Sequence, residues 1–339
     1  MNAPRSGHWA GQQERGSLWM LSLSVWLSRR CPRWLVRVVT WFVVAYFYLT
    51  SASARRNIRR YQQRLLAAMP EVRLPEFAPV WRQFLAFGVA IVDRFAVWQG
   101  RIHYADLQVE DPDGLYDDIR RAASRTEPGQ LMICSHVGNI EICRALVEHN
   151  RGFVLNILVH SRHAEKFNRA LAKAGASDIR LIQVADLDLP LMMALQQRLA
   201  AGEWLAIAAD RTPVRGEKTV TVDFLGHKAP MPQGPWLLAG LLDAPVNLVF
   251  CSWMGDRYRL RLERFSEAPT WSRQQRAAGV KQLAQRFADR LADECRQVPL
   301  QWFNFYDFWQ DGHAPKPVGD DPDEKSDAVR RAPETRAGE

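Results

Sequence analysis

The sequence has few cysteines and none of the cysteine spacings that bind zinc. The five are Cys31, Cys134, Cys143, Cys251 and Cys295, and they include no C-x-x-C pair. Their number is odd, and most of them lie within apolar runs. We therefore expect buried thiols in a reducing compartment, with no disulfide framework and no metal site.

Other missing motifs exclude further classes of protein. There is no G-x-G-x-x-G loop and no P-loop, so a nucleotide-dependent enzyme is not favoured and no cofactor is expected. There is no G-x-S-x-G turn, which argues against a serine nucleophile. The net charge of +8 is basic, but the motifs of nucleic-acid-binding proteins are missing too. The positive charge instead suits an anionic membrane surface or an acidic carrier protein.

An apolar, aromatic run with basic flanks lies near the N-terminus. Residues 1–17 are too polar for a secretory signal peptide. The run 34–49 would span about 24 Å as a helix, whereas a bilayer core is roughly 30 Å thick. Arginines lie on both sides of it: Arg29, Arg30, Arg33 and Arg37, then Arg55, Arg56, Arg59, Arg60 and Arg64.

This charge pattern places both ends of the run on the cytoplasmic side. We expect residues 1–65 to form a membrane-associated helical segment on the cytoplasmic face of the cell inner membrane. A helix in the membrane interface, or a shallow hairpin, fits best. A single spanning helix and a soluble helix packed on the domain are the alternatives.

From about residue 130, short apolar runs alternate with longer amphipathic ones. Strands are expected at 131–134, 153–159, 179–184, 204–208, 220–224, 245–253 and 258–263, and helices at 140–149, 164–174, 189–201, 235–242 and 273–296. Residues 57–120 look helical. The rhythm predicts an α/β fold, a largely parallel sheet flanked by helices, over residues 66–311. Residues 312–339 contain almost nothing apolar and are expected to form a disordered tail.

Three polar clusters follow predicted strands, at residues 135–139, 160–163 and 210–213. The carboxyl ends of parallel strands form the ligand-binding edge of a sheet. The sequence therefore predicts a site where these clusters meet.

In the first cluster, His136 and Glu141 could form a base and its orienting carboxylate. Gly138 would permit the tight turn between them, and Asn139 would cap the next helix. The backbone N–H groups there could hold an oxyanion. Alternatively, Glu141 only favours the helix N-terminus and His136 bonds locally.

The other two clusters offer charged groups for a substrate. Arg162 could bind a phosphate or carboxylate through two parallel hydrogen bonds, or it could be a solvated side chain. Asp210 and Arg211 could also contact a substrate, or they could form an ion pair that braces a loop.

Taken in order, four blocks of sequence resemble the glycerolipid acyltransferase superfamily, and most closely its lipid A biosynthesis branch. They are the H-x4-E block His136–Glu141, the apolar strand leading to Arg162, the apolar strand ending at Asp210-Arg211, and the proline before a strand at Pro245-Val246. The resemblance covers roughly residues 20–310. Near the C-terminus, residues 299–309 carry aromatic side chains where the lipid A enzymes have a basic pair.

The resemblance implies a membrane-associated O-acyltransferase. Such an enzyme moves a fatty acyl group from an acyl carrier protein or coenzyme A thioester to a hydroxyl of a lipid or glycolipid acceptor. His136 would be the general base and Glu141 would orient it, while Gly138, Asn139, Arg162, Asp210 and Arg211 would contact substrate. The alternatives are a thioesterase or lipid hydrolase that uses the same pair on water, and a non-catalytic membrane lipid-binding protein.

Overall fold

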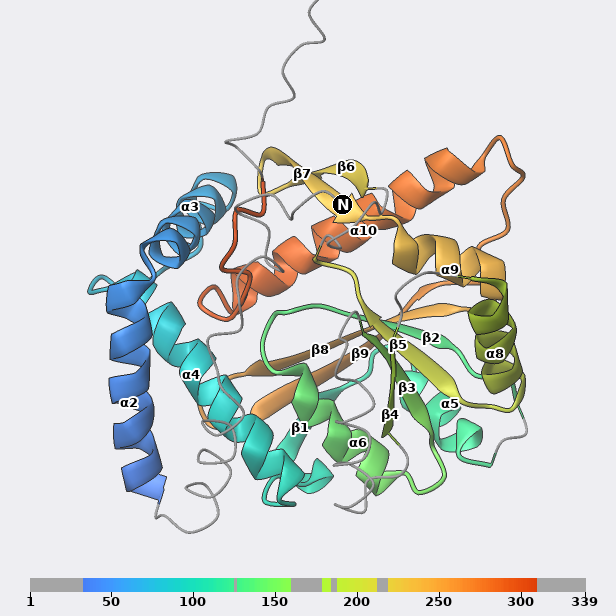
Figure 1. Cartoon of the computed structure of the whole chain (residues 1–339), viewed down its shortest axis with the longest axis horizontal. Coiled ribbons are helices and arrows are strands. Elements are labelled where there is room, and N and C mark those ends of the chain that lie inside the picture. Colours follow the sequence, from blue (N-terminus) through green and yellow to red (C-terminus); the bar gives the residue numbers. More distant parts are fainter. Residues whose placement is uncertain (1–32, 125–126, 160–178, 184–187, 212–218, 310–339) are drawn as a thin grey trace, which may run out of the picture. The chain divides into compact units, whose positions relative to one another are not determined.

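The centre of the fold is a seven-stranded sheet in which only one pair of neighbouring strands is antiparallel. A computed structural model describes residues 33–124, 127–159, 179–183, 188–211 and 219–309 (Figure 1). The strand order is β1-β9-β8-β2-β5-β3-β4, and β8 and β9 are the antiparallel pair. The strands are β1 (Leu107–Glu110), β2 (Leu131–Cys134), β3 (Leu155–Val159), β4 (Ile179–Gln183), β5 (Trp204–Ala208), β8 (Val246–Trp253) and β9 (Tyr258–Ser266). The α/β class and the largely parallel sheet are confirmed.

The strands at the centre of the sheet are apolar because helices cover both faces. All four residues of β2 are buried. Leu131 and Ile133 join the core on the side of α9 and α10, whereas Met132 and Cys134 join the core on the side of α5 and α6 (Figure 1). Successive side chains of a strand point to opposite faces, so a strand covered on both sides reads as a continuous apolar run.

Two strands were not predicted. β1 is only four residues long, lies within the region expected to be helical, and pairs with β9 at the edge of the sheet. β7 (His227–Pro232) contains two prolines and forms a separate antiparallel hairpin with β6 (Thr219–Phe224). The predicted strand at 220–224 is therefore real, but it lies outside the main sheet. The predicted helix at 164–174 lies outside the described residues.

The helices cover both faces of the sheet and extend the fold at the N-terminus. They are α2 (Arg33–Thr50), α3 (Ala52–Ala68), α4 (Pro79–Trp98), α5 (Leu115–Ala122), α6 (Arg144–His149), α8 (Leu189–Ala200), α9 (Gly234–Leu242) and α10 (Arg276–Gln297), with short 3-10 turns η2 (Tyr104–Asp106) and η3 (Ile140–Cys143). The four described cysteines, at 134, 143, 251 and 295, are buried free thiols, as predicted.

The apolar N-terminal run is a helix with one packed face and one exposed face. Trp41 and Tyr48 of α2 pack edge-on against Trp81 of α4. On the other face Phe42 is 65% exposed and Leu49 is 73% exposed. Within the described ranges no single helix is long and apolar enough to cross a membrane, although α2 and α3 together, bent by 91°, meet that criterion.

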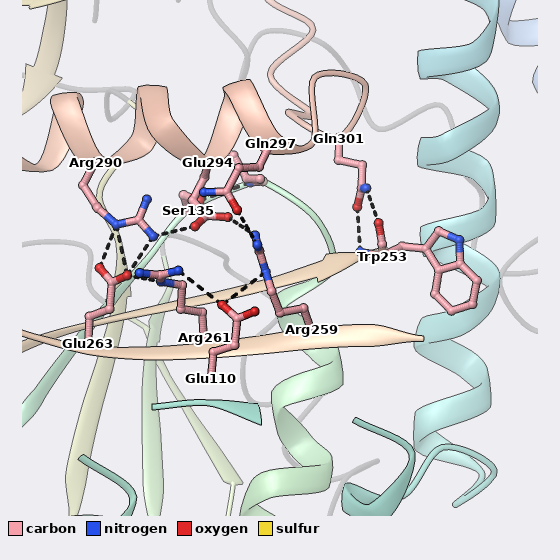
Figure 2. Close-up of polar contacts among 11 residues, drawn as sticks. Glu110, Ser135, Trp253, Arg259, Arg261, Glu263, Arg290, Glu294, Gln297 and Gln301 are labelled. Atoms are coloured by element: carbon pink, nitrogen blue, oxygen red, sulfur yellow. Dashed lines mark hydrogen bonds and ion pairs between the residues drawn. The ribbon is translucent and has the colours of Figure 1, made fainter. Parts of the chain in front are cut away.

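A buried network of arginines and glutamates joins α10 to β9 (Figure 2). Arg259 Nη2 lies 2.7 Å from Glu294 Oε2, and Arg290 Nη2 lies 2.6 Å from Glu294 Oε1. Arg290 also makes a two-pronged contact with Glu263, with distances of 2.7 Å to each oxygen. Glu294 and Arg259 are almost wholly inaccessible to solvent, so each charge depends on the other for its stabilisation.

We expect Glu294→Gln to lower the free energy of unfolding by about 3–5 kcal/mol, because it removes the close counter-ion of the buried Arg259 and leaves only a 4.0 Å contact with the partly exposed Glu110. Urea unfolding followed by circular dichroism measures this effect. Asp293→Asn is the matched control, since Asp293 is the preceding residue of α10 and forms only a long, exposed pair with Arg296. Equal stability of the two variants would contradict the assignment.

Candidate active site

The loop after β2 is fixed between β8 and the segment 301–304. Gly138 has φ 69°, and a Cβ atom there would lie 2.0 Å from the carbonyl oxygen of Cys251. Gly138 N donates to Gln301 O at 2.8 Å, and Asn139 N donates to Cys251 O at 2.7 Å. Phe303 N donates to His136 O at 3.0 Å. The predicted tight turn at Gly138 is present, and it holds His136 in one position.

These contacts correct two expectations. The backbone N–H groups of Gly138 and Asn139 donate to protein carbonyls, so they are not free to hold an oxyanion. Asn139 does not cap the following turn with its side chain; it is buried and donates from Nδ2 to Ala90 O on α4 at 2.9 Å. Both residues therefore shape the loop.

The carboxylate that faces His136 belongs to Asp210. His136 Nδ1 lies 2.7 Å from Asp210 Oδ1, and His136 N donates to Asp210 Oδ2 at 2.8 Å. Since a carboxylate is only an acceptor, Nδ1 carries the proton and Nε2 keeps a free lone pair. The His136 side chain is 29% exposed and that of Asp210 is fully buried. The imidazole is thus held from its buried side and accessible from the other.

Two residues near the C-terminus donate hydrogen bonds to the Asp210 carboxylate. Trp302 Nε1 and Asn304 Nδ2 each donate to Asp210 Oδ2 at 3.1 Å. Asn304 Nδ2 also donates to the backbone oxygen of Asp210 at 3.0 Å. The sequence shows the aromatic character of residues 299–309 but does not indicate a role for these two side chains. Their only signal in the sequence was the unusual density of aromatic residues.

Helices α3 and α4 hold this C-terminal segment in place. Gln62 Nε2 donates to Gln83 Oε1 at 2.9 Å, and Gln83 Nε2 donates to Trp302 O at 2.8 Å. Asn57 Nδ2 donates to Phe305 O at 3.1 Å. A chain of buried side-chain amides therefore links α3 to Trp302, the residue that contacts Asp210. On the opposite side, the Gln301 amide bonds both backbone groups of Trp253 at the end of β8 (Figure 2).

The charges and burial around His136 and Asp210 favour the protonation states that a general base and its orienting carboxylate require. Burial lowers the pKa of His136; the negative charge of Asp210 opposes this, while Arg211 and Arg94 reinforce it. Burial alone would raise the pKa of Asp210, but the charge and hydrogen bonds of His136, together with Arg211, hold it below its usual value. At neutral pH the ring is therefore neutral and the carboxylate ionised.

Glu141 contacts α4 and not His136. It is half-buried in η3 and accepts a hydrogen bond from Trp98 Nε1 of α4 at 3.3 Å. Among the described residues, no hydrogen bond or ion pair joins Glu141 to His136. The predicted contact between these two side chains is thus replaced by the contact with Asp210. The reason is the path of the chain: after Gly138 it turns into η3 and carries Glu141 toward α4.

The remaining predicted residues are placed as follows. Asp210 is fully buried, so its expected contact with a substrate is corrected to a contact with His136. Arg211 donates from Nε to Asn304 Oδ1 at 2.7 Å and from Nη2 to Phe303 O at 3.1 Å, and thus braces the C-terminal segment. Arg162 lies outside the described residues.

Comparison with known proteins identifies the family of this chain. The family model described as bacterial lipid A biosynthesis acyltransferase matches residues 14–311. The chain belongs to this family. It is an O-acyltransferase that acts on lipid-type substrates. Phosphatidylinositol mannoside acyltransferase from Mycolicibacterium smegmatis is 25% identical over 259 residues, which cover 75% of this chain and 78% of that protein.

This arrangement gives an acyltransferase a neutral imidazole that Asp210 orients through Nδ1 and that is partly accessible to solvent. A histidine with a free Nε2 can take a proton from a hydroxyl, and a buried carboxylate at Nδ1 fixes the tautomer and stabilises the imidazolium that results. Asp210 comes from β5, the parallel neighbour of β2, in which Cys134 pairs with Ala208. His136 and Asp210 each follow that pair by two residues, so the register of the two strands brings them together.

Proposed function

We propose that this acyltransferase moves a fatty acyl group from an acyl carrier protein or coenzyme A thioester to a hydroxyl of a lipid or glycolipid acceptor, with His136 as general base and Asp210 as the carboxylate that orients it. The observation that carries the proposal is the 2.7 Å contact between His136 Nδ1 and Asp210 Oδ1 beside an exposed ring edge. The likeness to a phosphatidylinositol mannoside acyltransferase favours an acceptor with a sugar-bearing headgroup.

The chemistry requires a base because an alcohol is about as weak an acid as water, with a pKa of roughly 15. His136 Nε2 takes the hydroxyl proton as the oxygen attacks the thioester carbonyl. A C–O bond forms, the C–S bond breaks, and the imidazolium returns the proton to the leaving sulfur. Asp210 stabilises the positive ring between these two transfers. The products are the acyl ester and the free thiol, and no acyl-enzyme is required.

We also propose that the enzyme works at the cytoplasmic face of the cell inner membrane. Support comes from the exposed aromatic face of α2 and from the exposed arginines Arg56 and Arg59 of α3. Aromatic side chains suit the headgroup region of a bilayer, and arginines attract anionic lipids. Weaker binding to anionic vesicles at higher salt would be the mark of such an interaction.

The test is acceptor dependence. Full-length protein is mixed with vesicles, a labelled acyl thioester on either carrier, and candidate lipid acceptors, and products are followed by mass spectrometry. We expect labelled acyl lipid to rise with acceptor concentration while free fatty acid stays a minor product. Release of free acid at the same rate with or without acceptor would instead identify a thioesterase. Binding to vesicles without turnover of any thioester would identify a lipid-binding protein.

A further inference from the structure

Helix α4 runs along the loop that carries His136. Ala90 O accepts from Asn139 Nδ2 at 2.9 Å, and Trp98 Nε1 donates to Glu141 Oε2 at 3.3 Å. Residues four apart lie on the same face of a helix, so Ala90, Arg94 and Trp98 share one face. Arg94 therefore lies between two contacts that α4 makes with residues 139 and 141, and it faces the His136 loop.

Arg94 is a half-buried cation that forms no ion pair with any residue the structure describes. Its Nε is buried and bonds no acceptor, and within the described part of the chain Arg94 forms no hydrogen bond or ion pair. Two carboxylates beside this part of α4 make other contacts: Asp93 Oδ2 accepts from Tyr258 Oη at 2.6 Å, and Glu141 accepts from Trp98. A buried donor without an acceptor is costly, which makes a ligand at this position favourable.

The charge of Arg94 acts on the site itself. Arg94 and Arg211 both lower the pKa of His136, and Arg94 lowers that of Arg211. The charges of two cations thus act on the imidazole, while the negative charge of Asp210 is already engaged by His136 on the buried side. An anion from the substrate would balance the positive charge on the open side.

We propose that Arg94 binds a phosphate group of the substrate beside His136. The inference rests on the proposed acyl transfer and adds to it. A fatty acyl thioester carries no charge at its acyl group, so an anion must come from the carrier or from the acceptor headgroup. Phospholipid headgroups carry a phosphate that can lie close to the reacting hydroxyl. Both candidate carriers also carry one, but the whole pantetheine arm separates it from the thioester, so the acceptor is the expected source beside His136. A guanidinium suits phosphate because it can donate two parallel hydrogen bonds.

The experiment compares Arg94→Gln with Arg82→Gln, a control on the same helix whose side chain is exposed and three turns away. Initial rates are measured with acyl-coenzyme A, acyl carrier protein and the phosphate-free donor acyl-N-acetylcysteamine. If the donor supplies the phosphate, Arg94→Gln raises KM about ten- to hundredfold for the first two donors and leaves the third unchanged. If the acceptor supplies it, KM for the phospholipid acceptor rises by that factor with all three donors.

A direct measurement separates this proposal from the proposed function. Binding of inorganic phosphate to the full-length protein is followed by calorimetry, and Arg94→Gln is expected to weaken it while Arg82→Gln does not. Were the wild type inactive with every donor and acceptor, the proposed acyl transfer would fail, and the phosphate comparison would still decide on Arg94. Unchanged phosphate affinity together with unchanged KM in every arm overturns the proposal. So does a fall in kcat alone, which would make Arg94 a residue that tunes His136.

Discussion

Replacing His136 by alanine is expected to lower kcat for acyl transfer by about 10²–10⁴-fold, the range that a positioned general base contributes. The expected change lies in kcat because the hydroxyl proton leaves only in the transition state, and KM for donor and acceptor should change little. The measurement is labelled acyl lipid formed at saturating thioester and acceptor. His136→Gln, which keeps the approximate volume of the ring, should be as inactive as the alanine variant.

The control for this experiment is His227→Ala, because His227 is an exposed residue of β7 outside the described site. Its rate should match that of the wild type. Thermal unfolding of each variant shows whether the fold is retained, since the backbone of His136 also contacts Phe303 and Asp210. Transfer by a folded His136→Ala protein at more than about a tenth of the wild-type rate would exclude His136 as the base.

The sequence led to His136 but not to its partner, and strand order is the reason. The apolar runs at 131–134 and 204–208 match β2 and β5 residue for residue. Nothing in the sequence says that these two strands are neighbours, because paired residues such as Cys134 and Ala208 are 74 positions apart. Once the order β2-β5 is known, the pairing of Cys134 with Ala208 places His136 beside Asp210. The H-x4-E spacing favours Glu141, which is close to His136 in sequence, whereas the contact depends on sheet register.

Trp302 and Asn304 were missed for a similar physical reason. They lie after α10, in a segment with no regular structure, and reach Asp210 only because α3, α4 and the end of β8 hold that segment. Such a position follows from tertiary packing and has no periodic signal. The oxyanion expectation at Gly138 and Asn139 failed likewise, because only the fold shows that Cys251 O and Gln301 O already accept from those N–H groups.

The contrast between Asp210→Asn and Glu141→Gln tests which carboxylate supports the base. An asparagine amide at position 210 can offer an N–H toward Nδ1, which would place the proton on Nε2 and remove the free lone pair. Loss of the correct tautomer is expected to lower kcat about 10³–10⁴-fold. Glu141→Gln keeps an oxygen that can accept from Trp98 Nε1, so a loss of less than about tenfold is expected for a residue that only supports the loop.

The pH profile gives an independent measurement of the same assignment. The base acts when neutral, so kcat/KM should fall as pH drops through the pKa of His136, and burial places this fall below the ordinary value of 6.5. The charge of Asp210 raises that pKa, so the residual activity of Asp210→Asn should fall at still lower pH. Glu141→Gln should keep the wild-type profile, because Glu141 is not among the groups that shift the ring. The opposite result has two parts. Glu141→Gln would lower kcat as much as Asp210→Asn does, and the acidic limb of the pH profile would move in Glu141→Gln but stay in place in Asp210→Asn. Glu141 would then be the partner of His136 in the working enzyme. The loop at Gly138 would then have to rearrange when substrate binds.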